Sequence, residues 1–293
     1  MDNKSLKHIL LAESGSTKTH FALIDVEHKQ IINEWVGGGV NPVIMGVEEL
    51  TMILTNEFQN LDAEQLIDLN IKWYGAGCTQ TDAKQILETI IHVLLPTQTI
   101  DIYSDMFATT QALYDVNESG IAIILGTGSN VCYVNGGSVS FLSPSLGYIL
   151  GDEGSGADIG KHIVKNMLYG NFFKESILQS FADEYNENHY DDIITGVYQS
   201  EKPNAYLASF SHFAFKHLDD PQINELIVSR FDALISGQLS KFIIAHPDAE
   251  IRASGSIAWH FNEQLKQSLE KHNLKLTKTI KSPIKALIAN YVY

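Results

Sequence analysis

The sequence has few cysteines, few basic side chains and no long apolar runs, and each shortage excludes a class of protein. Its two cysteines, Cys78 and Cys132, lie in apolar strand-like contexts, so we expect buried free thiols and neither a disulfide framework nor a CxxC metal site. Lys and Arg number 20 against 35 Asp and Glu, a formal charge of −15. That charge repels nucleic acid and anionic membranes, so we expect neither as a partner.

No apolar run approaches the ~20 residues that span a membrane, and residues 1–11 lack the apolar core and cleavage site of a signal peptide. We therefore expect a cytoplasmic protein. The 11 histidines are scattered, and His212 and His217 form no HExxH pattern, which argues against a zinc site. The sequence does have the composition of a globular chain, 44% apolar and 19% charged, and 293 residues suit two domains.

The most informative stretch is a polar turn between two apolar runs near the N-terminus. Ile9–Ala12 and Phe21–Ile24 enclose Ser14–Thr19, which contains one glycine and one lysine, and the pattern predicts strand, turn, strand. Such a turn can direct backbone N–H groups, hydroxyls and one ammonium into a single concavity, as a phosphate chain requires. The alternative is a hairpin tip with a solvated lysine, because small polar residues are common in such turns.

Two further polar positions follow predicted strands in the first half. The loop Gly37–Pro42 follows a strand expected over Gln30–Val36 and presents Asn41, although a plain connector fits the loop as well. Asp105 lies between a strand expected over Thr99–Tyr103 and a helix expected over Met106–Leu113. Open α/β sheets bind ligands at that end of a strand, but an aspartate there can also be only a helix cap.

The second half repeats the order of the first. Ile121–Leu125 is an apolar strand, Gly126–Asn130 (GTGSN) is a Gly/Thr/Ser turn, and Val131–Val134 and Ser138–Leu142 are predicted as the next two strands. The chain therefore resembles two copies of one α/β unit. Two such turns at equivalent places could hold a polyphosphate from both sides.

The remaining elements are predicted as helices and two more strands. Asp152 and its neighbours precede a helix with Ile159, Ile163 and Met167 on its buried face, and acidic residues at a helix start also have a dipole explanation. Residues 172–245 are expected to form helices with core-facing stripes and no chemistry: Phe173–Tyr185, Ala205–Leu218 and Ile223–Ala245. A strand over Glu250–Ala253 leads through Ser254-Gly255-Ser256 into a helix, a turn that can meet an anionic or planar ligand.

These motifs carry a family resemblance that runs nearly end to end. The order ESGSTKT (Glu13–Thr19), Ser104-Asp105, LGTGSN (Leu125–Asn130), LGDEGSG (Leu150–Gly156) and ASGS (Ala253–Ser256) resembles the N-acetylglucosamine kinase branch of the BadF/BadG/BcrA/BcrD ATPase family, within the actin, sugar kinase and Hsp70 superfamily. The resemblance implies an α/β fold of two RNase H-like (actin-like ATPase) domains with ATP in an interdomain cleft. We expect one domain over 1–117, with 282–293 packing back on it, and a second over 118–281 with a helical insertion near 172–245.

The resemblance also implies roles for individual residues in transferring phosphate from ATP to an amino sugar, most simply the 6-hydroxyl of N-acetylglucosamine. Asp105 would be the general base, and Glu13 would hold Mg²⁺ through water. ATP would contact Ser14, Gly15, Ser16, Thr17, Lys18, Thr19, Gly126, Thr127, Gly128, Gly255 and Ser256. The sugar would contact Asn41, Asp105, Ser129, Asn130, Gly147 and Asp152. A homodimer, common in the family, is one assembly that the resemblance allows.

Three positions depart from the family pattern. Glu13 stands where the family usually has aspartate, Gln111 where arginine is common, and His20 where an acidic residue is frequent. These changes keep a second hypothesis open, a catalytically weak or inactive sugar- or nucleotide-binding homologue. A third hypothesis, an ATPase that activates a radical dehydratase through a cysteine-bound iron–sulfur cluster, is least favoured because Cys78 and Cys132 lack that cluster context. The sequence does not identify the sugar.

Overall fold

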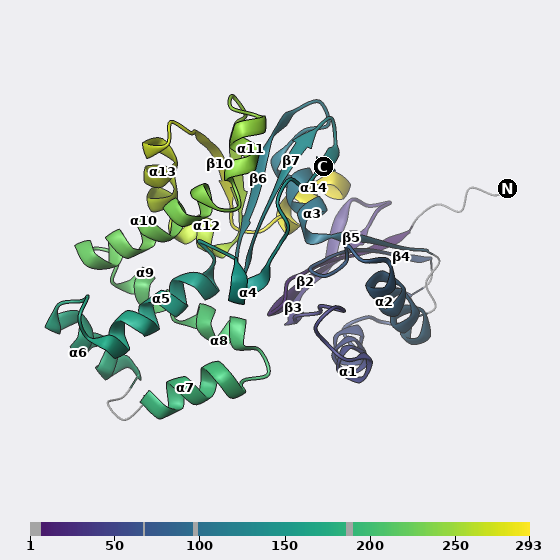
Figure 1. Cartoon of the computed structure of the whole chain (residues 1–293). Coiled ribbons are helices and arrows are strands. Elements are labelled where there is room, and N and C mark those ends of the chain that lie inside the picture. Colours follow the sequence, from purple (N-terminus) through teal and green to yellow (C-terminus); the bar gives the residue numbers. More distant parts are fainter. Residues whose placement is uncertain (1–6, 67, 96–98, 186–189) are drawn as a thin grey trace. The chain divides into compact units, whose positions relative to one another are not determined.

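Two structural units make up the chain in the computed structural model, which describes residues 7–66, 68–95, 99–185 and 190–293 (Figure 1). One unit comprises Met1–Ala112 and Pro283–Tyr293, and the other comprises Leu113–Ser282. Among the described residues, no helix combines the length and the apolar character needed to cross a membrane.

The first unit is built on a five-stranded sheet with the order β3-β2-β1-β4-β5. Strands β1, β2 and β3 are antiparallel neighbours, whereas β4 and β5 run parallel to β1. The strands are β1 (His8–Ser14), β2 (Lys18–Asp25), β3 (Gln30–Gly38), β4 (Leu69–Gly75) and β5 (Thr99–Ser104).

Helices cover both faces of this sheet because its central strands are apolar on both sides. On one face, α1 (Val47–Phe58) and α2 (Thr81–Leu94) pack against Leu10 and Trp73. On the other, α3 (Asp105–Leu113) and the C-terminal α14 (Ile284–Val292) pack against Ile9 and Leu11.

The second unit has a five-stranded sheet with the order β10-β9-β6-β7-β8. Its strands are β6 (Ser119–Leu125), β7 (Ser129–Asn135), β8 (Ser138–Ser140), β9 (Ile251–Ser254) and β10 (Leu276–Ile280). Its helices are α4 (Gly147–Leu150), α5 (Gly156–Tyr169), α6 (Glu175–Tyr185), α7 (Tyr190–Gln199), α8 (Pro203–Ser209), α9 (Ser211–Lys216), α10 (Pro221–Ser236), α11 (Ser240–Ala245), α12 (Ser256–His260) and α13 (Asn262–Lys271).

The two sheets share one topology, as the sequence repeat predicts. In each, three consecutive antiparallel strands are followed by two strands parallel to the first, so β6-β7-β8-β9-β10 corresponds to β1-β2-β3-β4-β5. The predicted α/β fold of two duplicated units is confirmed. The two cysteines are buried and free, Cys132 within β7 and Cys78 just after β4.

Several helix predictions need correction. The helix expected over Ala205–Leu218 breaks at Phe210, whose buried ring anchors the junction of α8 and α9 in the core. The helix expected over Ile223–Ala245 ends at Ser236, and Gly237–Leu239 separates α10 from α11. Ile86 on α2 is 37% exposed, whereas Leu87, Ile90 and Ile91 are buried against the sheet.

Candidate functional site

The first polar turn is tied to the loop that follows β3. Ser14 Oγ lies 2.7 Å from Thr19 Oγ1 and donates to the carbonyl oxygen of Val40 at 3.0 Å. The N–H of Val40 donates back to Ser14 Oγ at 3.1 Å, and Thr19 Oγ1 donates to the carbonyl of Gly38 at 2.7 Å. Both hydroxyls are fully buried. Ser14 and Thr19 therefore fix the shape of the turn from inside.

The middle of the turn carries the accessible polar groups. Thr17 and Lys18 are exposed, Gly15 and Ser16 are half-buried, and the N–H of Gly15 closes the turn on the carbonyl of Lys18 at 2.9 Å. A Cβ on Gly39 would lie 2.5 Å from the carbonyl carbon of Ser16. Only glycine allows this close approach of the two segments, so the loop after β3 packs directly against the turn.

Asn41, in the loop after β3, lies next to this turn. It is 9% exposed, its Nδ2 lies 3.5 Å from Ser16 Oγ, and its Oδ1 accepts from the N–H of Val43 at 3.1 Å. The same Oδ1 would lie 2.2 Å from a Cβ on Gly77, in the loop after β4. The loops after β1, β3 and β4 thus converge in the first unit.

Asp105 stands at the same edge of the sheet. The strand register pairs Ser14 with Gly75 and Gly75 with Ser104, so the carboxyl ends of β1, β4 and β5 form one row, and Asp105 follows it. Ser104 Oγ accepts from the N–H of Phe107 at 3.2 Å and so caps α3. Asp105 Oδ1 accepts from its neighbour, the N–H of Met106, at 2.8 Å. Burial raises the pKa of Asp105, against the opposing effect of the backbone N–H bonds.

The second polar turn, Gly126–Gly128 between β6 and β7, docks on the start of α5. The N–H of Gly126 donates to the carbonyl of Gly128 at 3.0 Å. The N–H of Gly156 donates to the carbonyl of Gly126 at 2.8 Å, and the N–H of Ala157 donates to that of Thr127 at 3.1 Å. The turn is therefore fixed by its carbonyl oxygens.

Asp152 packs directly beneath this turn. It adopts a left-handed backbone conformation with a φ of 56°, it is 8% exposed, and its Oδ2 would lie 2.8 Å from a Cβ on Gly128. Burial raises the pKa of Asp152 to about 6, the N–H of Ser129 donates to the carboxylate and opposes that shift, and Glu153 and Asp158 add to it. The structure thus brings Gly128, Ser129 and Asp152 together in the second unit.

The other predicted residues of this unit lie on neighbouring loops. Asn130 Oδ1 accepts from the N–H of Val131 at 2.9 Å, and Gly147 begins α4 with a φ of 71°. Gly255 has a φ of 119°, and a Cβ there would lie 2.1 Å from the carbonyl oxygen of Leu125. Only glycine allows this turn to approach the end of β6. Ser256 is exposed at the start of α12.

A buried charged network that the sequence did not reveal supports the Asp152 loop. Asp158, whose side chain is 5% exposed, accepts from the N–H of Gly154 at 3.1 Å and lies 3.3 Å from Nε of Arg230. His162 Nε2 lies 2.6 Å from Arg230 Nη1, and because Arg can only donate, that nitrogen accepts. His162 Nδ1 then donates to the carbonyl of Asp158 at 2.8 Å. The spacing of Asp158 and His162 on one helix face was the only available signal.

Gln238, between α10 and α11, was also missed. Its Nε2 lies 3.1 Å from Ser129 Oγ and 3.5 Å from Glu153 Oε2, and its carbonyl oxygen accepts from Ser143 Oγ at 3.1 Å. No local sequence pattern marks it, because its partners are distant in the chain. Gln238 therefore joins three segments of the candidate site of the second unit.

Glu13 is the candidate for magnesium. It is half-buried next to the first turn, directly opposite His20 in the β1–β2 register, and its Oε2 lies 4.0 Å from His20 Nδ1. Burial and then the nearby Lys18 charge lower the pKa of His20. Among the described residues, no group of three His, Cys, Asp or Glu could hold a metal ion. One carboxylate acting through water fits Mg²⁺, which keeps most of its waters, and does not fit a structural zinc site.

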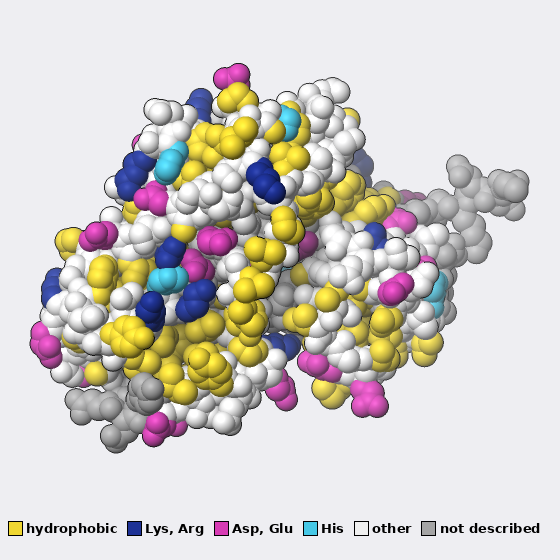
Figure 2. Space-filling model, viewed as in Figure 1, with side chains coloured by type: hydrophobic (Ala, Val, Ile, Leu, Met, Phe, Trp, Pro, Cys, Tyr) yellow, Lys and Arg dark blue, Asp and Glu magenta, His cyan; other side chains and the backbone are white. Residues whose placement is uncertain are grey.

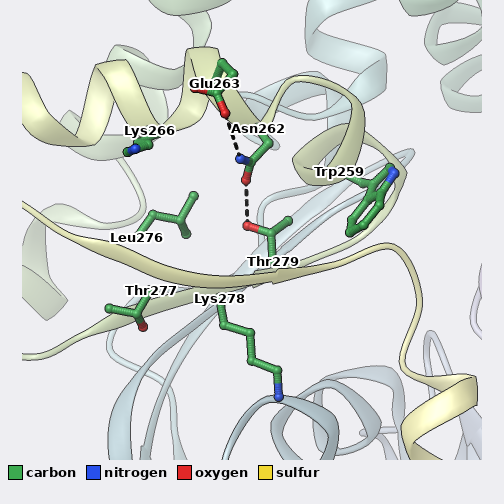
Figure 3. Close-up of a pocket in the computed structure, with 8 residues that line it drawn as sticks. All are labelled: Trp259, Asn262, Glu263, Lys266, Leu276, Thr277, Lys278 and Thr279. Atoms are coloured by element: carbon green, nitrogen blue, oxygen red, sulfur yellow. Dashed lines mark hydrogen bonds between the residues drawn. The ribbon is translucent and has the colours of Figure 1, made fainter.

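Two other surface features lie in the second unit. A hollow of about 420 Å³ lies between β10 and the α12–α13 segment, lined by Trp259, Asn262, Glu263, Lys266, Leu276, Thr277, Lys278 and Thr279 (Figure 3). None of the predicted site residues lines it, and Thr279 Oγ1 donates to Asn262 Oδ1 at 2.7 Å. Figure 2 shows apolar side chains over α4, where Leu146, Ile149 and Leu150 are exposed.

Two known proteins resemble this chain over most of its length. No family model matches the chain. The N-acetylmuramic acid/N-acetylglucosamine kinase of Clostridium acetobutylicum is 28% identical over 213 residues, which cover 70% of this chain and 69% of that protein. A crystal structure of a candidate N-acetylglucosamine kinase from Porphyromonas gingivalis has a TM-score of 0.87 at 32% identity and covers 96% of this chain and 97% of that one.

A more distant structure is similar in fold alone. The ROK family glucokinase from Streptomyces griseus, in complex with glucose and AMPPNP, has a TM-score of 0.56 at 11% identity and covers 97% of this chain and 98% of that one. The likeness to the Porphyromonas structure, in contrast, extends to sequence over nearly the whole chain.

Proposed function

The chain belongs to the family of N-acetylglucosamine kinase-like sugar kinases, and on that premise we propose that it transfers the γ-phosphoryl group of ATP to the 6-hydroxyl of N-acetylglucosamine. The observation that carries the proposal is the position of Asp105, in the row formed by the carboxyl ends of β1, β4 and β5, on the sheet edge that also bears the Ser14–Thr19 turn. A base and a phosphate-binding turn on one edge are the parts that phosphoryl transfer needs.

Asp105 is the proposed general base. Its Oδ1 is held by the N–H of Met106, which orients the carboxylate and leaves Oδ2 for the sugar hydroxyl. Burial raises the pKa of Asp105 toward the range in which a carboxylate can take a proton at neutral pH. As the hydroxyl oxygen attacks the γ-phosphorus, its proton passes to Asp105 and the bond to the β-phosphate oxygen breaks, leaving ADP.

The two polar turns are the proposed phosphate contacts. In the first unit, Ser16, Thr17 and Lys18 offer hydroxyls and one cation, while Ser14 and Thr19 keep the turn rigid through the loop after β3. In the second unit, Gly126–Gly128 is fixed by α5, and Gly255 and Ser256 border the adenosine. Rigid donors of this kind stabilise developing charge without reorganising.

Glu13 is the proposed anchor for Mg²⁺, through a water molecule, because a single half-buried carboxylate suits an ion that keeps its hydration shell. The ion, when bound, neutralises charge on the β- and γ-phosphates. Glu13 alternates in phase with Ile9 and Leu11 along β1, so its side chain lies on the side of the sheet that also bears α3.

Asn41 and Asp105 are the proposed sugar contacts of the first unit, and those of the second are Ser129, Asn130, Gly147 and Asp152. Carboxylates and amides suit sugar hydroxyls and an acetamido group.

We also propose that the chain belongs to the BadF/BadG/BcrA/BcrD ATPase family and that the protein is cytoplasmic. The proposed domains are 1–117 together with 282–293, and 118–281.

Coupled ADP release, measured with Mg²⁺ and ATP in the presence and absence of N-acetylglucosamine, tests this function. We expect ADP release that depends on the sugar. ATP and sugar binding without turnover would instead support the inactive homologue that Glu13 and Gln111 keep open.

A further inference from the structure

Gln238 occupies a place in the second unit from which it can control the hydrogen-bonding direction of a proposed sugar contact. Its side-chain Nε2 lies 3.1 Å from Ser129 Oγ and 3.5 Å from Glu153 Oε2. Its backbone carbonyl accepts from Ser143 Oγ at 3.1 Å, which fixes the turn between α10 and α11. The amide thus has a defined position next to Ser129.

The orientation of this amide follows from its neighbour. A carboxylate can only accept hydrogen bonds, so the Gln238 atom that faces Glu153 must be the NH₂ group. The same NH₂ group faces Ser129, and its second hydrogen points at the serine oxygen. Ser129 Oγ is therefore an acceptor toward Gln238.

Ser129 must then donate its own hydroxyl hydrogen elsewhere. Its backbone N–H is already committed to the Asp152 carboxylate, and the residue is 5% exposed. Within the described part of the chain, no hydrogen bond donated by the Ser129 hydroxyl is found. The hydroxyl is thus a nearly buried donor that awaits an acceptor, and leaving it unsatisfied has a cost.

We propose that Gln238 is a positioning residue that selects an N-acylated amino sugar over the free amino sugar, by holding the Ser129 hydroxyl as a donor toward the acyl carbonyl. The inference rests on the proposed function. An acyl carbonyl oxygen can only accept, so it matches this donor. The ammonium of an unacylated amino sugar can only donate, so it leaves the serine hydrogen without an acceptor.

The test is a swap that keeps every side chain nearly the same size. In the double variant Gln238→Glu with Glu153→Gln, the amide at 153 donates to the carboxylate at 238, and that carboxylate accepts from the Ser129 hydroxyl. Ser129 then presents lone pairs instead of a hydrogen to the sugar. Isothermal titration calorimetry with N-acetylglucosamine and with glucosamine, in the absence of nucleotide, measures the binding selectivity directly.

We expect the unaltered chain to bind N-acetylglucosamine more tightly than glucosamine. The swap should weaken N-acetylglucosamine binding about tenfold, the effect expected of one misdirected hydrogen bond in a buried site, and should leave glucosamine binding unchanged or tighter. Gln264→Met is the matched control, since Gln264 donates to Asn224 Oδ1 at 2.9 Å, where none of the proposed site residues lies. It should leave the selectivity unchanged.

A swap variant with unchanged selectivity would overturn the inference, as would an unaltered chain that binds neither sugar or prefers glucosamine. Equal weakening of both sugars would reduce Gln238 to a structural support and would also overturn it. The outcome is separate from that of the proposed function, because the binding ratio is measured without ATP. Selective binding without phosphoryl transfer would reject the kinase and leave the role of Gln238 standing.

Discussion

Asp105 shows how a neighbouring residue can take over the capping of a helix start. An aspartate at the start of a helix is commonly its cap, yet here the cap of α3 is Ser104. Among the described residues, the carboxylate of Asp105 accepts only from backbone N–H groups next to it, and burial raises its pKa. These features distinguish a candidate base from a capping residue, and the sequence alone left both interpretations open.

Replacing this base should stop phosphoryl transfer. In Asp105→Asn, an amide of nearly the same shape cannot take a proton, so kcat should fall by about 10²-fold or more while ATP affinity stays the same. Steady-state kinetics and ATP titration calorimetry measure the two effects. The matched control is Asp101→Asn on β5, the strand that precedes Asp105, where the carboxylate pairs with Lys72 at 3.2 Å and its side chain is 45% exposed. If Asp105→Asn retained its kcat, Asp105 would not be the base.

Asp152 should make sugar binding depend on pH. Burial raises its pKa to about 6, an effect increased by Glu153 and Asp158 and opposed by the N–H of Ser129 and by Lys161. In the proposed sugar contact, the carboxylate accepts from sugar hydroxyls above pH 6, and the protonated form loses that capacity below it. The dissociation constant for N-acetylglucosamine should therefore rise about tenfold for each pH unit below 6.

Calorimetric titrations between about pH 4.5 and pH 8 check this dependence. Asp152→Asn should bind N-acetylglucosamine weakly, and its dissociation constant should not rise further below pH 6. The same raised pKa implies that the contribution of Asp152 to folding is present below its ordinary pKa of 3.8 and is lost as pH rises through about 6. A pH-independent sugar affinity in the unaltered chain would mean that Asp152 does not contact the sugar in its ionised form.

At the scale of elements, the Asp152 loop depends on the helices behind it. Asp158 on α5 binds the loop through the N–H of Gly154 and pairs with Arg230 on α10, while His162 joins the same two helices. Burial opposes ionisation of Asp158, but the His162 hydrogen bond and the Arg230 charge hold its pKa below the usual range. The loop is therefore positioned by a charged contact between α5 and α10.

Removing this carboxylate should destabilise the fold. Asp158→Ala leaves Arg230, whose side chain is only 18% exposed, without its carboxylate partner, so the free energy of unfolding should fall by about 3 kcal/mol. Urea denaturation measures the loss. Because the pKa of Asp158 is depressed, its contribution is present above 3.8 and is lost as pH falls through its folded value, so the difference from the unaltered chain should shrink in acid.

The exposed pair of Lys216 and Glu184, 2.8 Å apart, supplies the comparison for this experiment. Lys216→Ala should cost no more than about 1 kcal/mol, as surface ion pairs do. Equal losses of unfolding free energy in the two variants would show that the Asp158 contact stabilises the fold no more than a surface ion pair does.

The sequence predicted elements where a local pattern decides the structure. The apolar runs on both sides of Ser14–Thr19 and Gly126–Asn130 predicted both hairpins, and the structure has β1-β2 and β6-β7 there. Sequence-based prediction failed where packing against distant segments decides where a helix ends. Apolar spacing continues through Phe210 and across Gly237, yet both helices break there. Gln238 and Arg230 escaped prediction for the same reason, since their partners lie far away in the chain.

At the scale of the whole molecule, the repeat of one strand order in two units is the feature that the sequence predicted best. It could be found because each copy begins with the same strand, glycine-bearing turn and strand. The sugar itself could not be identified, because the proposed contacts lie on loops, where no sequence pattern indicates hydrogen bonds such as that between Gln238 and Ser129. The net charge of −15 limits partners but does not select among small molecules.

The central claim is that the chain phosphorylates an N-acetylated amino sugar, and the reaction product tests it most directly. The unaltered chain is incubated with ATP, Mg²⁺ and N-acetylglucosamine, and the sugar is analysed by mass spectrometry and by phosphorus–proton correlation NMR. We expect a sugar monophosphate whose phosphorus couples to the protons on C6 and whose formation is lost in Asp105→Asn. Unmodified sugar at full enzyme and ATP concentrations, or a phosphate that forms equally well in Asp105→Asn, would contradict it.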